Sequence, residues 1–374
     1  MRIGIDASRT TVARRTGTEG YALNLIRAML DRGAAHDFLL YFRDQPAPDL
    51  FEGGTRRVIP FPRLWTHARL SFELLTGRRP DVLFVPAHVL PLVALANPLP
   101  SVVTVHDLGY KYFPDAHPLT QRLYLDWSAR FSSRAAARVL VDSHATRRDL
   151  RHFYHIPADK IAVVYPGRDE TLHRVDPAPV RAKYHLPGDY LLHVGTLQPR
   201  KNLIRLIEAV QLVMLRDHSP LVTLVLAGRP GWLSAPILAK ARAHAGTVRV
   251  LEYVPDEDLA GLYSGARAFV FPSLYEGFGF PVLEAMACGA PVICSNTSSL
   301  PELAGEAALL VDPLDTSALA SAILRILSEA DLCGRLVEKG SAQIRKFSWT
   351  KAAREALAVL VEAGTERKNR NSRN

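Results

Sequence analysis

The sequence predicts an α/β fold of two Rossmann-like domains in tandem, each a doubly wound parallel sheet covered by helices. Its 374 residues, 48% of them hydrophobic and 22% charged, are enough for two domains that each bury their own core. Short apolar runs alternate with longer helix-like segments, an alternation typical of parallel sheets. It stops in a polar, proline-bearing stretch, residues 168–189, and then starts again, so we expect this stretch to link the two domains.

The strand candidates follow one another in order along both halves of the chain. Those of the first half are RIGIDA (2–7), DFLLYF (37–42), RRVIPF (56–61), DVLFVP (81–86), SVVTVHD (101–107), RVLVDS (138–143) and IAVVYP (161–166). Those of the second half are YLLHVG (190–195), LVTLVLAG (221–228), VRVLEYV (248–254), ARAFVFPS (266–273), APVICSN (290–296) and AALLVDP (307–313). We expect ligands at the carboxyl ends of these strands, in the cleft between the domains.

The predicted domains are 1–170 and 171–349, followed by a C-terminal segment, 350–374. Residues 350–363, TKAAREALAVLVEA, have the pattern of an amphipathic helix, which we expect to pack back toward the first domain. The basic residues after it predict a frayed tail.

Composition excludes several other classes of protein. Three irregularly spaced cysteines, Cys288, Cys294 and Cys333, predict neither a disulfide framework nor a zinc site, so a reducing cytoplasm is the simplest location. We expect no signal peptide, because the N-terminus MRIGIDASRT lacks an apolar core, and no membrane span, because no apolar run reaches about 18 residues. The net charge of +9 would suit a nucleic acid, an anionic membrane, an anionic substrate or water alone.

The stretch SLYEGFGFPVLEAMACG, residues 273–289, is the most informative of the chain. A strand is expected to end near Ser273 and a helix to start near Pro281, whose fixed φ suits a first helical turn. The amides of such a helix start are suited to bind phosphate or sugar hydroxyls. Glu276 would lie on the loop and Glu284 in the first helical turn, where each carboxylate could accept two adjacent hydroxyls. The plainer alternative is that both glutamates only stabilise the helix dipole.

This stretch strongly resembles the Glu-x7-Glu motif of family 4 of the retaining glycosyltransferases, which have the GT-B fold of two Rossmann-like domains. The resemblance spans nearly the whole chain. The other segments that carry it are MRIGIDASRT and GTEGYALNLIRAML near the N-terminus, VVTVHDL (102–108), HVGTLQPRKNLIRLIEAV (193–210) and VPDEDLAGLYSGARAFVFPS (254–273).

The resemblance implies a role for each matching residue of the motif. Glu276 would contact hydroxyls of the transferred sugar, and Glu284 the ribose of the nucleotide. The loop Gly277, Phe278, Gly279 and Phe280 would bind the sugar and phosphate, with backbone N–H groups of the last three as donors.

Lys201 matches the lysine that holds the diphosphate in this family. From the residues alone, QPRKN at a strand-to-helix turn is a sensible cation site for stabilising a diphosphate leaving group. The family often has an arginine directly after the strand's glycine, where this chain has Thr196 after Gly195. We expect Arg200 to supply the second cation; the alternative is a solvated basic helix start.

Two positions of the first domain also match. His106, at the end of a buried strand, looks like the histidine that contacts the transferred sugar, whereas Asp107 has helix capping as its alternative. Gly17 and Gly20 flank Thr18 and Glu19 where the family's glycine loop lies over the diphosphate, and Gly17 is the position that we carry over.

Two further features of the second domain complete the expected site. The backbone of Val254, on the loop before PDEDLAGLY, would touch the nucleotide base. Asp256 and Asp258 have the Asp-x-Asp spacing that another glycosyltransferase fold uses for metal, but here Asp256 as N-cap and acids in the first helical turn explain it. We therefore expect neither a metal requirement nor a cofactor.

The sequence thus predicts a metal-independent, retaining hexosyltransferase that uses a nucleotide-diphosphate sugar as donor and a glycan or lipid-linked hydroxyl as acceptor. The resemblance favours GDP-mannose because this donor is frequent in the family, and UDP- or ADP-sugars fit the same loop. The alternatives are a GT-B sugar-nucleotide epimerase and a non-catalytic sugar-nucleotide-binding protein. We expect no nucleic acid partner, since no Arg-rich recognition helix or aromatic stacking motif is present.

Peripheral contact with the inner face of a membrane stays open at this point. RLWTHARLSFELLTGRRP (63–80) and HPLTQRLYLDWSARFSSRAAAR (117–138) mix Arg, Trp, Tyr and Leu as surface-lying helices do. The alternative is that the Leu and Trp side chains pack on the sheet while the arginines face water.

Overall fold

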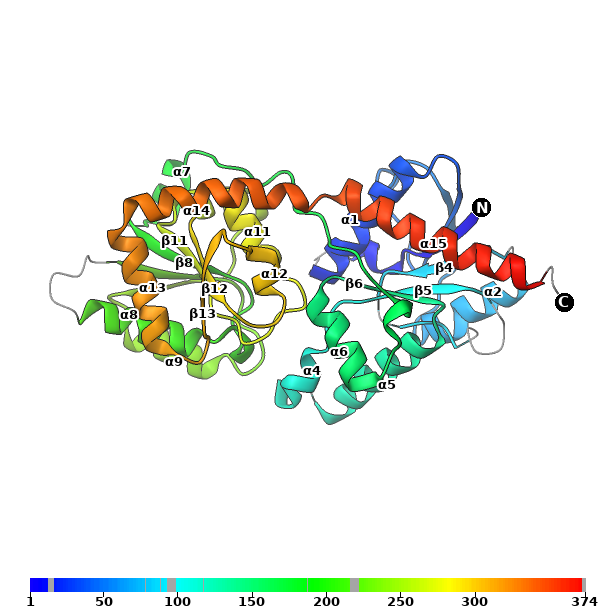
Figure 1. Ribbon diagram of the computed structural model, residues 1–374, viewed down its shortest axis with the longest axis horizontal. Coiled ribbons are helices and arrows are strands. Elements are labelled where there is room, and N and C mark those ends of the chain that lie inside the picture. The colour runs from blue at the N-terminus through cyan, green and yellow to red at the C-terminus, as the bar shows by residue number, and fades with distance from the viewer. Residues whose placement is uncertain are drawn as a thin grey trace. The chain divides into compact units, whose positions relative to one another are not determined.

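The computed structural model describes residues 1–12, 17–77, 79–87, 89–92, 99–116, 118–186, 188–215 and 222–371. The chain forms two compact units. Unit 1 comprises Met1–Gly167 together with Phe347–Asn374, and unit 2 comprises Arg168–Lys346. Each unit is an α/β layer structure with helices on both faces of a twisted sheet (Figure 1).

Unit 1 is built on a parallel sheet of seven strands in the order β3-β2-β1-β4-β5-β6-β7. Its strands are β1 (Arg2–Asp6), β2 (Asp37–Phe42), β3 (Thr55–Val58), β4 (Val82–Val85), β5 (Ser101–Val105), β6 (Arg138–Val141) and β7 (Ile161–Val163). β4 and β5 are buried at every position, which explains why they are unbroken apolar runs rather than alternating ones.

Unit 2 is built on a parallel sheet of six strands in the order β10-β9-β8-β11-β12-β13. Its strands are β8 (Tyr190–Val194), β9 (Thr223–Ala227), β10 (Val248–Leu251), β11 (Ala268–Phe271), β12 (Val292–Ser295) and β13 (Ala308–Val311). Every strand candidate of the sequence overlaps one of the observed strands, and only β3 begins outside its candidate, by one residue, so the α/β class and the two Rossmann-like sheets are confirmed.

Helices connect the strands and cover both faces of each sheet. Those of unit 1 are α1 (Gly17–Arg32), the π-helix η2 (Trp65–Leu70), α2 (Ser71–Thr76), α4 (Gly109–Tyr112), α5 (Leu119–Ala135), α6 (His144–Tyr154) and α15 (Trp349–Asn371). Those of unit 2 are α7 (Ala178–Lys183), the 3-10 helix η5 (Pro199–Lys201), α8 (Leu203–Met214), α9 (Ala235–Ala243), α10 (Asp256–Gly265), α11 (Phe280–Ala287), α12 (Leu300–Ala304), α13 (Thr316–Ser328) and α14 (Ala330–Gln343).

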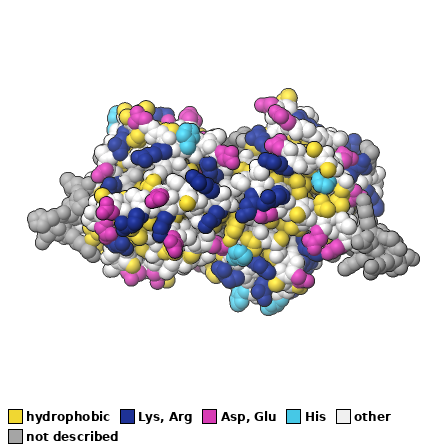
Figure 2. All heavy atoms as spheres, turned by 45° about the horizontal axis from the view of Figure 1, so that its top comes forward, with side chains coloured by type: hydrophobic (Ala, Val, Ile, Leu, Met, Phe, Trp, Pro, Cys, Tyr) yellow, Lys and Arg dark blue, Asp and Glu magenta, His cyan; other side chains and the backbone are white. Residues whose placement is uncertain are grey.

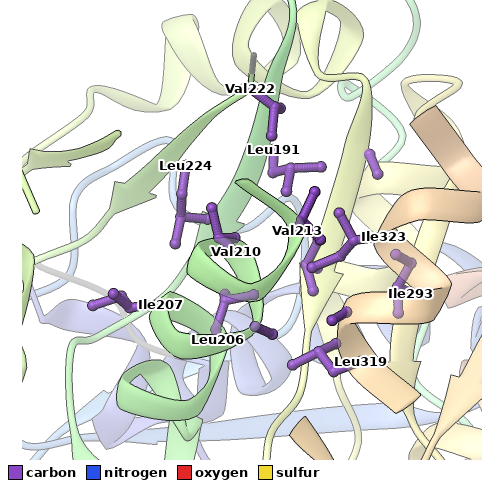
Figure 3. Packing of buried hydrophobic residues seen from close by; sticks show 14 of the residues in the cluster. Leu191, Leu206, Ile207, Val210, Val213, Val222, Leu224, Ile293, Leu319 and Ile323 are labelled. Carbon is purple, nitrogen blue, oxygen red and sulfur yellow. The ribbon is translucent and has the colours of Figure 1, made fainter. Parts of the chain in front are cut away.

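Two apolar clusters hold unit 2 together, one with side chains from α8 and α13, the other with side chains from α10 and α11. In the first cluster, Leu206 and Val210 of α8 lie among Leu191, Ile293 and Ile323 from β8, β12 and α13 (Figure 3). All five side chains are fully buried, and burial of a Leu or Ile side chain contributes about 1.5–3 kcal/mol. The helices are therefore fixed to the sheet, and so are the loops that begin at its carboxyl edge.

Helix α15 completes the core of unit 1 although it is the last element of the chain. Ala353, Ala356 and Leu360 are fully buried in the same cluster as side chains of β1 and α1. The helix extends to Asn371, beyond the amphipathic segment 350–363 and through most of the tail that was expected to fray.

The stretch 168–189 differs from the linker expected there. It belongs to unit 2 and contains α7, which packs against α10 and buries Val180 in a cluster of that unit. The proline-rich composition was misleading because Pro177 and Pro179 lie at the start of a short helix, a position that proline favours.

Candidate functional site

The loop that joins β11 to α11 lies at the point where the strand order of unit 2 reverses. Strands β8 and β11 are neighbours, and their connections run to opposite sides, so the segments that follow them diverge at the carboxyl edge. Ligands of doubly wound sheets bind at such switch points. One segment carries Arg200 and Lys201, and the other carries Glu276.

The backbone of this loop is fixed by two serines that follow β12. The Ser298 hydroxyl accepts a hydrogen bond from the Glu276 N–H at 3.0 Å. The Ser299 hydroxyl, fully buried, lies 2.9 Å from the Glu276 carbonyl oxygen and 2.5 Å from that of Phe278. Because these bonds hold the main chain on both sides of Gly277, the loop is shaped before any ligand binds.

Gly279 makes the turn into α11. Its φ of +116° lies in the region that L side chains rarely adopt, and a Cβ there would lie 2.8 Å from Leu300 Cδ2. The helix then begins at Phe280, with Pro281 in its first turn as expected. Phe278, Gly279 and Phe280 are therefore consecutive at a helix N-terminus, where backbone N–H groups carry partial positive charge.

Two cations converge on the carboxylate of Glu276. Lys201 Nζ lies 2.6 Å from Oε1, and Arg200 Nη1 lies 2.7 Å from Oε2. Arg200 also donates to the carbonyl oxygen of Tyr275 at 2.5 Å. The structure thus brings together three of the four residues predicted to be catalytic, with Arg200 and Lys201 in contact with the same carboxylate.

Burial alone would raise the pKa of Glu276. The charges of Lys201 and Arg200 outweigh it and lower that pKa to about 2. Glu276 is consequently ionised at every physiological pH. Its single negative charge lies between two positive charges, so the cluster of three side chains is positive overall.

Lys201 is held from a second side by aromatic and apolar groups. Its ammonium lies 4.5 Å from the centre of the Phe271 ring, and its side chain is only 9% exposed. The fully buried ring of His193, on β8, donates from Nδ1 to the carbonyl oxygen of Val270 at 3.0 Å. Burial and the Lys201 charge lower the pKa of His193 to about 3, so this ring is neutral and adds no competing positive charge.

Glu284 lies in the second turn of α11, not in the first turn as expected, because the helix begins at Phe280. Its Oε2 accepts a hydrogen bond of 2.8 Å from the hydroxyl of Tyr263 on α10. Burial raises the pKa of Glu284 to about 7, and the charges of Asp169 and Asp256 act in the same direction. This carboxylate therefore titrates close to neutral pH, unlike that of Glu276.

Val254 lies on the loop between β10 and α10, as predicted from the sequence. Its side chain is partly buried against the core of unit 2. The expected N-cap is wrong by one residue: Pro255 occupies that position, and Asp256 is the first residue of α10. Asp258 accepts bonds of 2.6 Å from Lys183 and from the Tyr184 hydroxyl, so its carboxylate already serves packing between α7 and α10. The carboxylate of Asp258 therefore has a structural role in unit 2.

The remaining predicted residues, Gly17 and His106, belong to unit 1. His106 follows β5, and its Nδ1 lies 2.6 Å from the carboxylate of Asp142, which follows β6. Asp107 accepts from the N–H of Gly109, the first residue of α4, although Leu108 and not Asp107 occupies the N-cap position. Gly17 to Gly20 form the first turn of α1 rather than an open loop, and the residues just before them, 13–16, lie outside the described ranges.

Sequence reasoning missed the residues that support the site rather than face a ligand. They are Ser298, Ser299, Tyr263 and Asp142, each 21 to 36 positions from the residue that it contacts. The local signal was the polar run NTSS (296–299) directly after β12, since ligands of doubly wound sheets bind at the carboxyl ends of the strands.

The surface carries both signs of charge. Lys and Arg side chains are spread over the face drawn in Figure 2, with Asp and Glu among them, in keeping with the net charge of +9. In the described ranges, no group of three His, Cys, Asp or Glu side chains is arranged to hold a metal ion. No helix within those ranges is long and apolar enough to cross a membrane.

Comparison with known proteins identifies the family. Residues 15–172 match the family model described as Glycosyltransferase Family 4, and residues 188–329 match that described as Glycosyl transferases group 1. The O-antigen chain mannosyltransferase B of Escherichia coli is 37% identical over 263 residues, which cover 69% of each chain. The chain belongs to glycosyltransferase family 4. It is therefore a glycosyltransferase, as the motif around Glu276 predicted.

Other members of the family and structures of the same fold extend this result. The serotype-specific mannosyltransferase WbdA of Escherichia coli is 30% identical over 74% of this chain, which spans about a third (36%) of that longer protein. Among solved structures, Anabaena HepE in complex with UDP and glucose has a TM-score of 0.74 at 19% identity, covering 97% of this chain and all of the other. The architecture is accordingly GT-B.

Proposed function

We propose that this glycosyltransferase moves a hexosyl group, mannosyl by first choice, from a nucleoside-diphosphate sugar to a hydroxyl of a glycan or lipid-linked acceptor, with retention at the anomeric carbon and without a metal ion. The observation that carries the proposal is the convergence of Lys201 and Arg200 on Glu276 at the start of α11. It combines a site for two negative charges with a carboxylate that can accept sugar hydroxyls.

The donor would bind by replacing the ion pairs that Lys201 and Arg200 make with Glu276. The diphosphate becomes the counter-ion of Lys201 and Arg200, which releases Glu276 to accept hydrogen bonds from hydroxyls of the sugar. The backbone N–H groups of Phe278, Gly279 and Phe280 add positive potential at the phosphate. The carboxylate of Glu284 accepts from the ribose, and the backbone of Val254 borders the base.

The reaction would then proceed on one face of the sugar. The bond from the anomeric carbon to the leaving phosphate oxygen breaks, the acceptor oxygen forms its bond on the same face, and the acceptor proton passes to the leaving phosphate. Lys201, Arg200 and the α11 amides stabilise the charge that develops on the diphosphate. As the family resemblance implies, His106 of unit 1 would contact the transferred sugar, and Gly17 would contribute to binding the diphosphate.

Mannose is the preferred sugar because the names of two relatives, at 37% and 30% identity, are those of mannosyltransferases. GDP is accordingly the expected nucleotide. UDP and ADP remain the competing choices, since a solved structure of the same fold holds UDP.

Thermal unfolding with GDP, UDP, ADP and dTDP, each with and without EDTA, tests this proposal first. A nucleotide that binds only the folded protein raises the midpoint. We expect GDP to raise it most, EDTA to change nothing, and Glu284→Ala to abolish the rise. Release of GDP from GDP-mannose, followed by assignment of the anomeric configuration of the product by NMR, then tests transfer and retention. Binding without any turnover would instead favour the non-catalytic alternative.

A second proposal concerns where the protein works: we infer peripheral contact with the cytoplasmic face of a membrane. Helix α5 buries small residues, among them Ser128, Ala129 and Ser132. Of its large apolar side chains, Leu125 and Phe131 pack partly against the core, and the others are exposed. The exposed fractions are 59% for Leu119, 58% for Leu123, 46% for Tyr124 and 44% for Trp127. This favours a surface-lying helix over packing of these side chains on the sheet.

Neighbouring residues of η2 and α2 extend the same surface. The His67 ring of η2 lies 5.9 Å from that of Trp127, and Phe72 and Leu75 of α2 are 59% and 46% exposed. Co-sedimentation with vesicles containing anionic lipid at low salt tests the contact. Leu119→Gln with Leu123→Gln should reduce it, and the matched change of exposed Leu314 in unit 2 should not. Equal binding by both variants, or none by the parent protein, contradicts this inference.

A further inference from the structure

The site in unit 1 contains a carboxylate that sequence reasoning did not assign, Asp142. Strands β5 and β6 are parallel neighbours in which Val105 pairs with Val141. Because His106 and Asp142 each follow directly after this pair, the sheet places them side by side at its carboxyl edge. The contact between them is therefore set by the strand register.

Both ring nitrogens of His106 have polar partners, and the side chain stays 13% exposed. Nδ1 lies 2.6 Å from Asp142 Oδ2, and Nε2 lies 3.3 Å from the carbonyl oxygen of Pro86. The Tyr21 ring meets the imidazole edge-on at 4.7 Å between centroids. The Thr146 hydroxyl donates to the His106 carbonyl oxygen at 3.1 Å, which fixes the main chain as well.

These contacts determine the protonation of the ring. The Pro86 carbonyl oxygen can only accept, so Nε2 carries a proton when that contact is made. Burial raises the pKa of Asp142 while the charge of His106 opposes this rise, and where Asp142 is ionised Nδ1 carries the second proton, so that the ring is an imidazolium. Asp142 is only 3% exposed, and its Oδ1 has no hydrogen-bond partner among the described residues. Since a buried carboxylate without compensation is costly, the His106 cation is its natural counter-ion.

The charged groups around the ring support the same state. Burial alone would lower the pKa of His106, but the carboxylate of Asp142 outweighs it, and Asp107 adds to the effect, so that the pKa is raised. Tyr21, the titratable group that faces the ring from α1, has a pKa raised well above 10 by burial and by Asp142, so it stays neutral.

We propose that Asp142 is a positioning residue that keeps His106 doubly protonated and directs its Nε2–H to a hydroxyl oxygen of the transferred sugar. The inference rests on the proposed function for the identity of that acceptor, whereas the coupling of the two side chains does not depend on it. On sugar binding, the weak contact of Nε2 with Pro86 is exchanged for a bond to the substrate. Asp142 itself touches no substrate.

A histidine that donates a hydrogen bond and a histidine that acts as general base predict opposite dependences of activity on pH. A base needs Nε2 unprotonated, so its activity would fall as pH decreases through the pKa of His106. A donor needs Nε2 protonated, so its activity falls as pH rises through that pKa. The dependence of kcat/KM on pH therefore separates the two roles directly.

Asp142→Asn tests the proposal, because the amide oxygen can still accept from Nδ1 while the negative charge is removed. Nitrogen-15 NMR of the full chain reports the pKa and tautomer of His106 without any need for turnover. We expect the pKa of His106 to fall by about one pH unit or more in the variant. We also expect kcat/KM to fall about 100-fold, with its alkaline limb moved to lower pH.

The matched control is Asp149→Asn, which removes another buried carboxylate of unit 1, one that accepts from the Tyr112 hydroxyl at 2.6 Å. It should leave the pKa of His106 and the pH profile unchanged. An unchanged NMR titration in Asp142→Asn, or an acidic limb in place of the alkaline one, overturns the proposal.

The test remains decisive if the variant does not fold and if the parent protein is inactive. If Asp142→Asn does not fold, a pKa of His106 in the parent protein at or below the usual value of about 6.5 is sufficient to overturn the inference. If the parent protein turns over no sugar nucleotide while the NMR coupling is found, the proposed function fails and the link between Asp142 and His106 stands.

Discussion

At the scale of single residues, the two glutamates of the motif differ in chemistry although they lie on one loop and helix. Glu276 is neutralised by two cations, which lower its pKa to about 2, whereas burial raises the pKa of Glu284 to about 7. Different environments that separate two pKa values are a recurring mark of groups with different tasks. One carboxylate is thus a fixed charge, and the other can respond to a ligand.

The first prediction concerns Glu276→Gln. Without the carboxylate, Lys201 and Arg200 lose their internal counter-ion, so the affinity for a nucleoside diphosphate should be retained or increase. Sugar transfer should fall about 100- to 1,000-fold, because the contact with the sugar hydroxyls is lost. Calorimetric titration with GDP and a transfer assay measure the two effects separately.

The control for this change is Glu306→Gln, which removes an exposed ion pair with Lys339 in the same unit. It should alter neither quantity. Loss of nucleotide binding in Glu276→Gln, in step with activity, would mean that the carboxylate only shapes the loop.

The second prediction concerns pH and Glu284. Ribose hydroxyls donate to the ionised carboxylate, so binding favours the deprotonated form of a group whose pKa is about 7. Nucleotide affinity should therefore rise about tenfold from pH 6 to pH 8, as the ionised fraction increases. Glu284→Gln should weaken binding and remove this dependence.

Tyr263→Phe provides an opposite test in the same titration. The Tyr263 hydroxyl donates to Glu284 and lowers its pKa, so its removal should move the midpoint of the affinity profile to higher pH. A profile that is flat in the parent protein would show that Glu284 is not the ribose ligand, or that it is ionised throughout this range.

At the scale of elements, the sequence was most informative where burial is uniform. The strands were predictable because both faces of a parallel sheet are covered, which demands continuous apolar runs such as VLFV in β4. Short helices were harder: α7, six residues with two prolines at its start, has the composition of a linker, and only its contact with α10 reveals it.

The candidate site divides in the same way. Glu276, Lys201 and Arg200 could be found because a local pattern contains each of them. Their supports could not, since Ser299 reaches Phe278 across 21 positions and Asp142 reaches His106 across 36. Such contacts follow from strand order, which no local pattern of residues encodes.

The third prediction belongs to the turn into α11. Gly279→Ala places a Cβ at a φ of +116° and 2.8 Å from the fully buried Leu300, so it should destabilise unit 2 by about 1–3 kcal/mol. It should also weaken nucleotide binding, because the amides of the helix start move. Thermal unfolding and GDP titration measure the two effects.

Gly334→Ala is the matched control on α14, where an added Cβ meets no atom within 4 Å. Alanine is preferred over glycine inside a helix by about 1 kcal/mol, so this variant should be slightly more stable than the parent. Equal stability of both variants would show that the turn relaxes without cost.

At the scale of the whole molecule, the last helix, α15, belongs to unit 1. The cluster around β1 and α1 also contains side chains of α15, which follows the residues of unit 2 in the sequence. Unit 1 is consequently built from both ends of the chain, whereas unit 2 is continuous.

This arrangement leads to the last prediction, which concerns Leu360→Ala. Leu360 is fully buried in the core of unit 1, so its truncation should cost about 2–5 kcal/mol. Hydrogen exchange should then accelerate in β1, β4 and β5 of unit 1 and stay unchanged in the strands of unit 2, because none of the α15 side chains that the structure describes is buried in the unit 2 clusters. GDP affinity, which we assign to unit 2, should be preserved while sugar transfer decreases. Leu212→Ala, at a 40% exposed position of α8, is the control that should change neither quantity. Faster exchange in both units would instead mean that the two unfold as one cooperative body, and that the last helix stabilises the whole protein rather than unit 1.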